Sequence, residues 1–163
     1  MLSKRQREEQ IKRGFGHGLP PEVLLYELQH PLSITAYAHT PPATWGLQLC
    51  KWRDSVRLPA ILKALRAQDT ERAMYILAAT LIQAAEDGHV ELVKAVIAVQ
   101  APAPSMQVWS PTRWARYSAL RVAAANGRKD CFEVLLESLE KYVDKKEESL
   151  LRAILRMNTL EVL

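Results

Sequence analysis

The segments AAEDGHVELVKAVI (residues 84–97) and SALRVAAANGRKDCFEVLLE (residues 118–137) match each other when Gly88 is aligned on Gly127. In both, a pair of alanines precedes the glycine, an acidic residue follows it, and two pairs of apolar residues come next. The pattern predicts the same unit twice: a short helix, a turn, and a longer helix with one apolar face. Because glycine adopts a left-handed backbone without steric cost, we expect Gly88 and Gly127 to end the first helix of each unit.

This repeated pattern resembles the ankyrin repeat, which has a small-residue pair, an Asn/Asp-Gly turn, and an acid followed by an apolar pair. The ankyrin period is about 33 residues, whereas Gly88 and Gly127 are 39 residues apart. Residues 80–82 and 118–121 stand where the family has Thr-Pro-Leu-His, and both lack the proline and the histidine. The resemblance implies an all-α, ankyrin-like helical repeat stack that binds proteins. It also implies that His89 bonds the backbone of a neighbouring repeat.

The chain divides into an arm and a helical body. Residues 1–18 form a basic arm that ends in a glycine hinge, Gly-Phe-Gly-His-Gly. Residues 19–163 are expected to form a helical N-terminal cap followed by ankyrin-like repeats. The clear repeats cover 79–99 and 118–138.

The C-terminal residues 149–163 resemble a partial third repeat. Asn158 takes the place of the turn glycine there, because asparagine also accepts a left-handed conformation. The preceding residues 136–149 predict an extension of a second helix and then a charged, solvated stretch. An alternative interpretation is that the last four residues, Leu-Glu-Val-Leu, begin a protease site from an expression vector.

Two proline pairs predict the first helices of the cap. Pro20-Pro21 begins a helix that runs to about Gln29, since proline is tolerated in a first helical turn. Pro41-Pro42 begins another helix. Its aromatic and aliphatic residues at helical spacing are expected in the core rather than in a ligand cage; they are Trp45, Leu49 and Trp52.

A further pair of helices is expected at Leu58–Arg66 and Thr70–Leu77, on either side of Gln68-Asp69. Residues 58–78 only faintly resemble the repeat, so we interpret them as a degenerate helical cap. Terminal repeats of such stacks are commonly atypical.

Basic residues gather in two regions of a chain whose net charge is +4. No acidic residue lies between Glu91 and Asp130, and that interval contains Lys94, Arg113, Arg116, Arg121, Arg128 and Lys129. The arm contains Lys4, Arg5, Arg7, Lys12 and Arg13. The two regions predict acidic partners, either an acidic protein face or RNA.

The connection at 100–117 is predicted to be the main binding element. It is about six residues longer than the ankyrin period requires, and it lies where ankyrin fingers project. Its prolines and serines exclude a long regular helix, but residues 112–117 are compatible with the start of one. Arginine beside aromatic residues suits both protein hot spots and stacked RNA bases. The candidate partner-binding residues are Trp109, Arg113, Trp114, Arg116 and Tyr117, together with Lys4, Arg5, Arg7, Lys12 and Arg13 of the arm. The alternative is that the tryptophans pack onto the helices and the arginines only solvate the surface.

Residue patterns typical of enzymes and metal sites are not found in the sequence. The four histidines have no metal-ligand spacing to one another or to a cysteine. Cys131 falls on a core position and is expected to be a buried apolar residue. Cys50 lies beside Lys51, which leaves a lowered thiol pKa open, but no histidine base accompanies it. We therefore predict a non-enzymatic protein without catalytic, metal or cofactor-binding residues.

The function predicted is that of a protein–protein interaction scaffold, a small structural subunit of a larger assembly. The alternative is an RNA-contacting structural protein of a ribonucleoprotein, which would use the arm and the 100–117 connection. Two cysteines without a CxxC motif predict an intracellular, cytoplasmic protein; the alternative is one long-range disulfide between Cys50 and Cys131. The start MLSKR resembles a mitochondrial presequence, but Glu8 and Glu9 argue against one. The sequence has no run of 18 apolar residues, so no membrane partner is expected.

Overall fold

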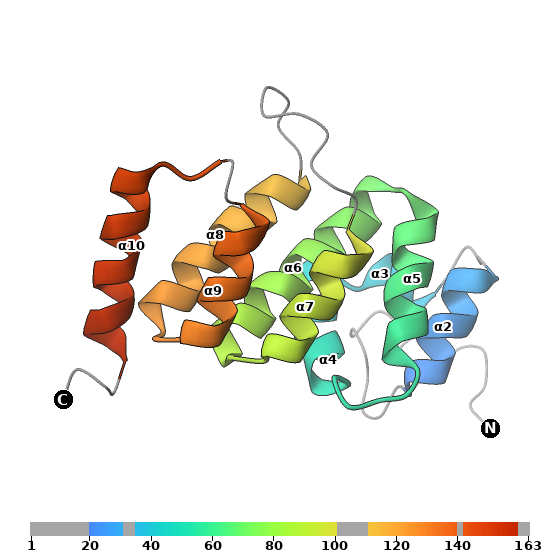
Figure 1. Ribbon diagram of the computed structural model, residues 1–163. Helices are drawn as coiled ribbons and strands as arrows, with labels where there is room; N and C mark the ends of the chain where they lie inside the picture. The colour runs from blue at the N-terminus through green and yellow to red at the C-terminus, as the bar shows by residue number, and fades with distance from the viewer. Residues whose placement is uncertain (1–19, 31–34, 101–110, 140–141, 160–163) are drawn as a thin grey trace.

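The computed structural model describes residues 20–30, 35–100, 111–139 and 142–159 (Figure 1). In these ranges all regular secondary structure is helical, which confirms the predicted all-α class there. The helices are α2 (Pro21–Gln29), α3 (Ala36–His39), α4 (Pro42–Lys51), α5 (Leu58–Gln68), α6 (Glu71–Asp87), α7 (Val90–Val99), α8 (Pro111–Ala125), α9 (Lys129–Ser138) and α10 (Lys145–Asn158). None of these helices combines the length and the apolar character that crossing a lipid bilayer requires.

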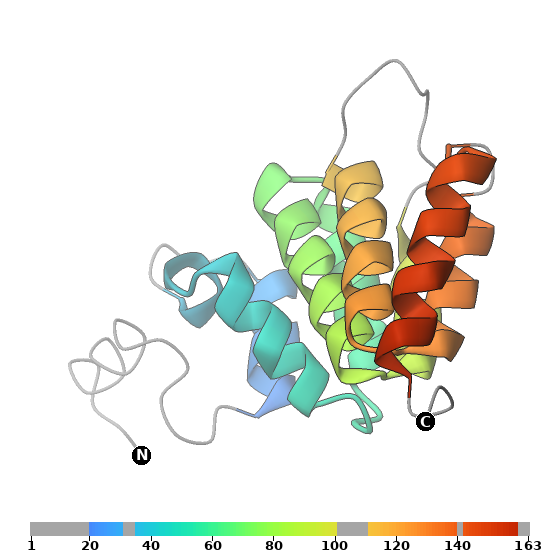
Figure 2. The ribbon, with the colours of Figure 1, turned by 90° about the vertical axis from the view of Figure 1, so that its left-hand side faces the viewer.

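The helices stack in two layers. In the first layer α4 packs on α6, α6 on α8, and α8 on α10 (Figures 1 and 2). In the second layer α2 packs on α5, α5 on α7, and α7 on α9. The layers meet where α6 packs on α7 and α8 packs on α9, so the two predicted units form two neighbouring helix pairs.

Both predicted glycine turns are present. Gly88 has φ 80° and follows the last residue of α6, and Gly127 has φ 66° after α8. The next residue closes each turn by a backbone bond back into the first helix, from His89 N to Ala84 O (2.9 Å) and from Arg128 N to Ala123 O (2.8 Å). These bonds satisfy carbonyls that have no partner within the helix. The predicted left-handed helix ends are confirmed.

The expected lengths of the two helices in each unit were wrong. The first helix is the longer one: α6 has 17 residues and α7 has 10, while α8 has 15 and α9 has 10. Thr70 caps α6, since its hydroxyl accepts a bond from the Ala73 N–H. No glycine or proline interrupts the sequence from there to Asp87. The segment Thr70–Leu77, assigned to the cap, is therefore the first part of the same helix as residues 78–87.

The junction between α5 and α6 is short. It consists of Asp69, which ends α5 with φ 50°, and the cap residue Thr70. An aspartate tolerates this left-handed conformation better than most residues with a side chain. The two-residue junction brings α6 back against α5 with no projecting finger between them.

Small residues allow the first-layer helices to pack closely. The alanine pairs Ala84-Ala85 and Ala123-Ala124 are fully buried where α6 packs on α8. Trp45 and Leu49 of α4 are fully buried and Trp52 is half-buried, which confirms their assignment to the core. Complete burial of a leucine-sized side chain stabilises a fold by about 1.5–3 kcal/mol.

The C-terminal helix differs from the expected third repeat. The helix α10 begins after Asp144, whose carboxylate accepts a bond from Glu147 N (2.7 Å), and it continues through Asn158. Asn158 is not left-handed, since its side-chain amide donates to Ile154 O inside the helix (2.9 Å), and Thr159 follows with φ −93°. The predicted extension of the previous helix covers only residues 136–138, because α9 ends at Ser138, and the charged residues from Lys145 onward belong to α10.

Candidate functional site

An apolar hollow of about 440 Å³ lies between α4, α6 and α8, and we call it the α4–α6–α8 groove. It is open to solvent on the first-layer side of the stack. The residues that line it are uncharged: Pro42, Ala43, Tyr75, Ala79, Ile82, Gln83 and Trp114. A hollow of this kind suits an apolar peptide or side chain better than a charged ligand.

The floor of the groove is one stripe of α6. Tyr75, Ala79 and Ile82 recur at the spacing that places side chains on one helical face. The opposite face of α6 is buried against its neighbours through residues such as Ile76 and Leu77. The stripe is half-buried rather than covered, so α6 presents apolar groups both to the core and to the groove.

The wall formed by α4 is held close to α6. A Cβ built on Gly46 would lie 2.8 Å from the backbone carbon and from the Cβ of Ala79, so only glycine permits this approach. The Arg72 guanidinium donates to the carbonyls of Tyr37 and Thr40, just before α4 begins. These contacts fix the position of Pro42 and Ala43 at one edge of the groove.

The other wall is formed by Trp114 at the start of α8. Its side chain is 44% exposed, and its ring meets the Tyr75 ring edge-on, with centroids 6.4 Å apart. Aromatic pairs of this geometry are stabilising beyond their buried area. The pair therefore gives the groove a fixed aromatic edge that still faces solvent.

The structure brings Trp114 to the groove but scatters the other candidates of the 100–117 connection. Residues 111–117 are the first part of α8, which confirms the helix start left open for residues 112–117 and shortens the connection. Trp109 lies outside the described residues, as do all five basic candidates of the arm. Arg113 is half-buried and interacts with other groups of the protein.

Arg116 is buried and Tyr117 is half-buried, and both are bonded within the protein. Arg116 is buried, and its Nε donates to the Gln100 side-chain oxygen (3.2 Å), while burial lowers the pKa of the guanidinium. It therefore does not offer a free charge to a partner, contrary to the prediction. The Tyr117 hydroxyl donates to Glu147 of α10. Burial and this bond to Glu147 raise the pKa of Tyr117 to about 12.

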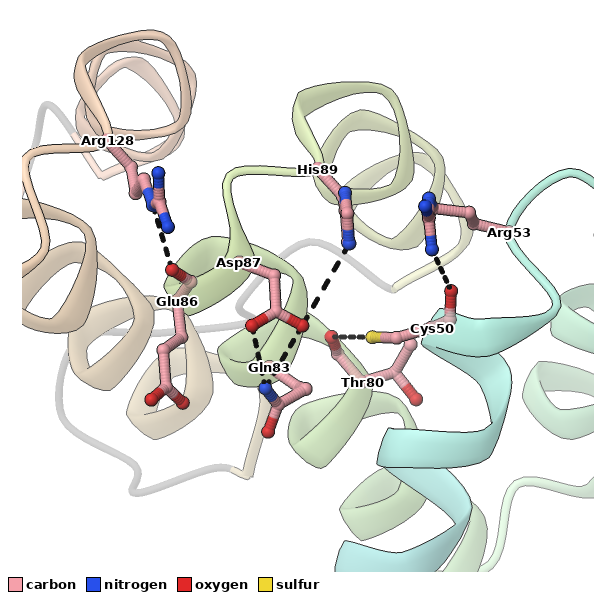
Figure 3. Close-up of polar contacts among 8 residues, drawn as sticks. All are labelled: Cys50, Arg53, Thr80, Gln83, Glu86, Asp87, His89 and Arg128. Atoms are coloured by element: carbon pink, nitrogen blue, oxygen red, sulfur yellow. Dashed lines mark hydrogen bonds and ion pairs between the residues drawn. The ribbon is translucent and has the colours of Figure 1, made fainter.

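The turns between α6 and α7 and between α8 and α9 lie along one edge of the stack (Figure 1), and several polar contacts lie beside them (Figure 3). Gln83 donates to both carboxylate oxygens of Asp87 (3.1 Å each), and His89 Nε2 lies 3.9 Å from that carboxylate. Among the residues that the structure describes, His89 does not make the expected inter-repeat backbone bond. Arg128, the residue aligned with His89 in the second unit, makes such a bond instead: its Nε donates to Glu86 O (2.9 Å). The longer side chain spans the gap between the two turns.

Neither cysteine is prepared for nucleophilic chemistry. Burial raises the pKa of Cys50 to about 12, with the Asp87 charge as a second cause, and its thiol contacts Thr80 O at 3.7 Å. The sequence left open that Lys51 lowers the pKa of the Cys50 thiol, and this possibility is wrong. Cys131 is buried as predicted, and burial raises its pKa to about 11.

A second hollow, of about 350 Å³, lies between the loop at 52–57 and the helices α5 and α7. Its polar lining mixes both charges: Arg53, Asp54, His89 and Glu91. In the described ranges no group of three histidine, cysteine or acidic residues is placed to hold a metal ion. Because its lining mixes both charges and the described residues offer no metal-binding group there, this hollow is a weaker candidate for a binding site than the α4–α6–α8 groove.

The groove was missed by sequence reasoning, although part of its signal is present in the sequence. The spacing of Tyr75, Ala79 and Ile82 indicates a second apolar face on 71–87, beyond the face required for the core. The predicted boundary near residue 78 split this face between two elements, so the face was not recognised. The contributions of Pro42 and Trp114 depend on packing between distant segments, which no local pattern encodes.

Comparisons of this chain with family models, with curated proteins and with solved structures find no match.

Proposed function

We propose that this protein is a non-enzymatic protein–protein interaction scaffold with an ankyrin-like helical stack, and that it serves as a structural subunit of a larger assembly. The observation that supports the proposal most is the α4–α6–α8 groove. It is apolar, uncharged and open, and it carries the aromatic edge formed by Tyr75 and Trp114. Tryptophan and tyrosine in such surroundings are the residues that most often dominate protein interfaces.

The ankyrin-like part of the proposal is supported by the matching sequence units and by their two left-handed glycine turns. Stacked helix pairs of this type form extended surfaces, on which a groove across neighbouring units is a natural binding place. Each wall of the groove comes from a different helix of the first layer, so binding there would depend on the stack as a whole.

The RNA-contacting alternative has less support. Arg116 is bonded to Gln100, Arg121 lies 3.9 Å from Glu147, and Arg128 bonds the backbone of Glu86. Lys94 pairs with Glu91 (3.5 Å), and Arg113 and Lys129 also interact with other groups of the protein. All six cations between Glu91 and Asp130 are therefore engaged within the chain, which reduces the charge offered to phosphate groups. Binding to RNA would also weaken steeply as salt is raised.

A pair of positions on α4 tests the proposal. A photoreactive phenylalanine is introduced at Ala43, which lines the groove, or at Leu47, which is exposed one turn further along the same helix. We expect a defined protein adduct in cells from position 43, no such adduct from position 47, and its loss when Trp114→Ser is added. Equal adducts at both positions, an adduct that survives Trp114→Ser, or an RNA adduct would refute the proposal.

A further inference from the structure

The outer face of α10 carries an apolar stripe whose two ends the stack leaves exposed, while Ile154 between them is half-buried against the core. Leu150, Ala153, Ile154 and Met157 recur at the spacing of one helical face. Leu150 is 62% exposed and Met157 is 77% exposed. The residues that attach α10 to the rest of the protein, Leu151 and Leu155, are buried on another face. We call the four residues the α10 stripe.

The position of α10 in the first layer indicates what kind of element fits the stripe. In that layer α6 lies between α4 and α8, and α8 lies between α6 and α10 (Figure 2). The stripe faces away from α8, on the side where a further helix of the layer would lie. Helices pack in this way when apolar ridges of one enter the grooves of the other. The geometry therefore favours a helix as the occupant.

The charges around the stripe indicate the chemistry of that helix. The acids of α10 are engaged: Glu147 accepts from Tyr117, and Glu148 accepts from Arg152 (3.1 Å). Two cations border the stripe, Lys146 one turn before Leu150 and Arg156 beside Met157, and both are exposed. Neither forms an ion pair within the part of the chain that the structure describes. The border of the stripe is therefore cationic.

In the folded stack, Arg152 ties α10 to α9 and so holds the stripe in one position. Arg152 donates twice to Glu133 of α9, at 2.6 and 3.3 Å, and its guanidinium lies over the Phe132 ring. A surface that needs no rearrangement before binding loses less entropy when a partner docks.

We propose that the α10 stripe binds an amphipathic helix of another protein, whose own apolar stripe is bordered by aspartate and glutamate. This interaction is separate from binding in the α4–α6–α8 groove. A second copy of this chain fits less well, because a symmetric contact through the same patch would bring the cationic border against itself.

The probes for the experiment are two synthetic helical peptides with the same leucine stripe, one bordered by glutamate and the other by lysine. Their affinity for the full chain is measured by fluorescence anisotropy at low salt. We expect the glutamate-bordered peptide to bind about tenfold tighter or more, since opposite charges favour the contact and like charges oppose it.

Variants locate the binding site. Leu150→Gln with Met157→Gln should abolish binding, whereas Val56→Gln, at an apolar residue that is 89% exposed in the loop at 52–57, should leave it unchanged. Lys146→Glu with Arg156→Glu should reverse the preference between the peptides. Circular dichroism checks that each variant is folded.

Three results would overturn the proposal. They are equal affinity for both peptides, binding that survives the double glutamine change, or a preference that charge reversal does not alter. Sedimentation of the chain alone gives a fourth, since a stable dimer that dissociates in the Leu150→Gln, Met157→Gln variant would make a second copy the occupant.

Discussion

Gly88 and Gly127 have nearly the same backbone conformation, but their surroundings differ. A Cβ on Gly88 would meet the flexible side chain of Arg128, 3.1 Å from its Cδ. A Cβ on Gly127 would lie 2.2 Å from the backbone oxygen of Asn158, at the end of α10. The first glycine is thus required by its own turn, whereas the second is required by its turn and by the helix packed beside it. Equivalent positions in two repeats can therefore carry different structural demands.

The largest effect is expected for Gly127→Ala. The left-handed conformation costs about 1–2 kcal/mol for a residue with a Cβ, and displacing the end of α10 adds about 1–3 kcal/mol, as overpacking usually does. We expect a loss of unfolding free energy of about 2–5 kcal/mol in urea titrations. If Gly127→Ala proves no more destabilising than Gly88→Ala, the close contact with Asn158 is not a constraint on this turn.

Gly46→Ala tests close approach without a left-handed turn. Gly46 lies inside α4, where alanine is the better helix former by about 1 kcal/mol, but its new methyl would meet the Ala79 backbone at 2.8 Å. We expect a net loss of about 1–3 kcal/mol, because a backbone cannot give way as a side chain can. A stabilised variant in thermal unfolding would contradict this packing. The change should also weaken binding in the α4–α6–α8 groove.

Gly88→Ala should be the mildest of the three substitutions. We expect only the conformational cost, about 1–2 kcal/mol, because the Arg128 side chain can move aside. A double-mutant cycle sharpens the comparison: in an Arg128→Ala background the cost should fall, with a coupling of about 0.5 kcal/mol or more. Additive effects in urea titrations would show that the new methyl and Arg128 do not meet.

The smallest effect is expected in the alkylation rates of the cysteines. This measurement tests the turn at Gly127, because Cys131 follows it in the sequence. Burial raises the pKa values of Cys131 to about 11 and of Cys50 to about 12, so both thiols stay protonated in the fold at mildly alkaline pH. The stabilisation from these neutral thiols is complete below the pKa of the unfolded chain and is lost as pH rises toward those values. Alkylation followed by mass spectrometry should therefore be slow at both.

The alkylation rates of the two cysteines also distinguish Gly127→Ala from Gly88→Ala. We expect Gly127→Ala to accelerate the alkylation of Cys131, which follows that turn, and to leave Cys50 slow. Gly88→Ala should change the alkylation rates of Cys131 and Cys50 by no more than a small factor. Rapid labelling of both cysteines in Gly127→Ala would indicate global rather than local opening.

Features encoded by neighbouring residues could be predicted from the sequence. The turns at Gly88 and Gly127 follow from a residue type with a special conformation, and the helix after Pro20 follows from a known start signal. The burial of Trp45 follows from helical spacing. Each of these depends on a few adjacent positions.

Features that depend on distant packing could not be predicted. The burial of Arg116 requires Gln100, the residue that follows α7, and Trp114 becomes part of a groove only because Tyr75 lies beside it. The helix α10 ends at Asn158, but the left-handed conformation expected there was wrong. Asparagine can either cap a helix or bond within it, and the local sequence does not decide between them. The candidate site was therefore less predictable than the fold.

The central position of α6 has a consequence for how the protein folds. This helix packs against α4, α5, α7 and α8, whereas the terminal helix α10 packs mainly on α8. Elements that share many contacts with neighbours close in sequence tend to form early and to open last. The amide hydrogens of α6 are therefore expected to exchange with solvent most slowly, and those of α10 to exchange through a local opening. The C-terminal helix would then detach and rejoin while the centre of the stack stays folded.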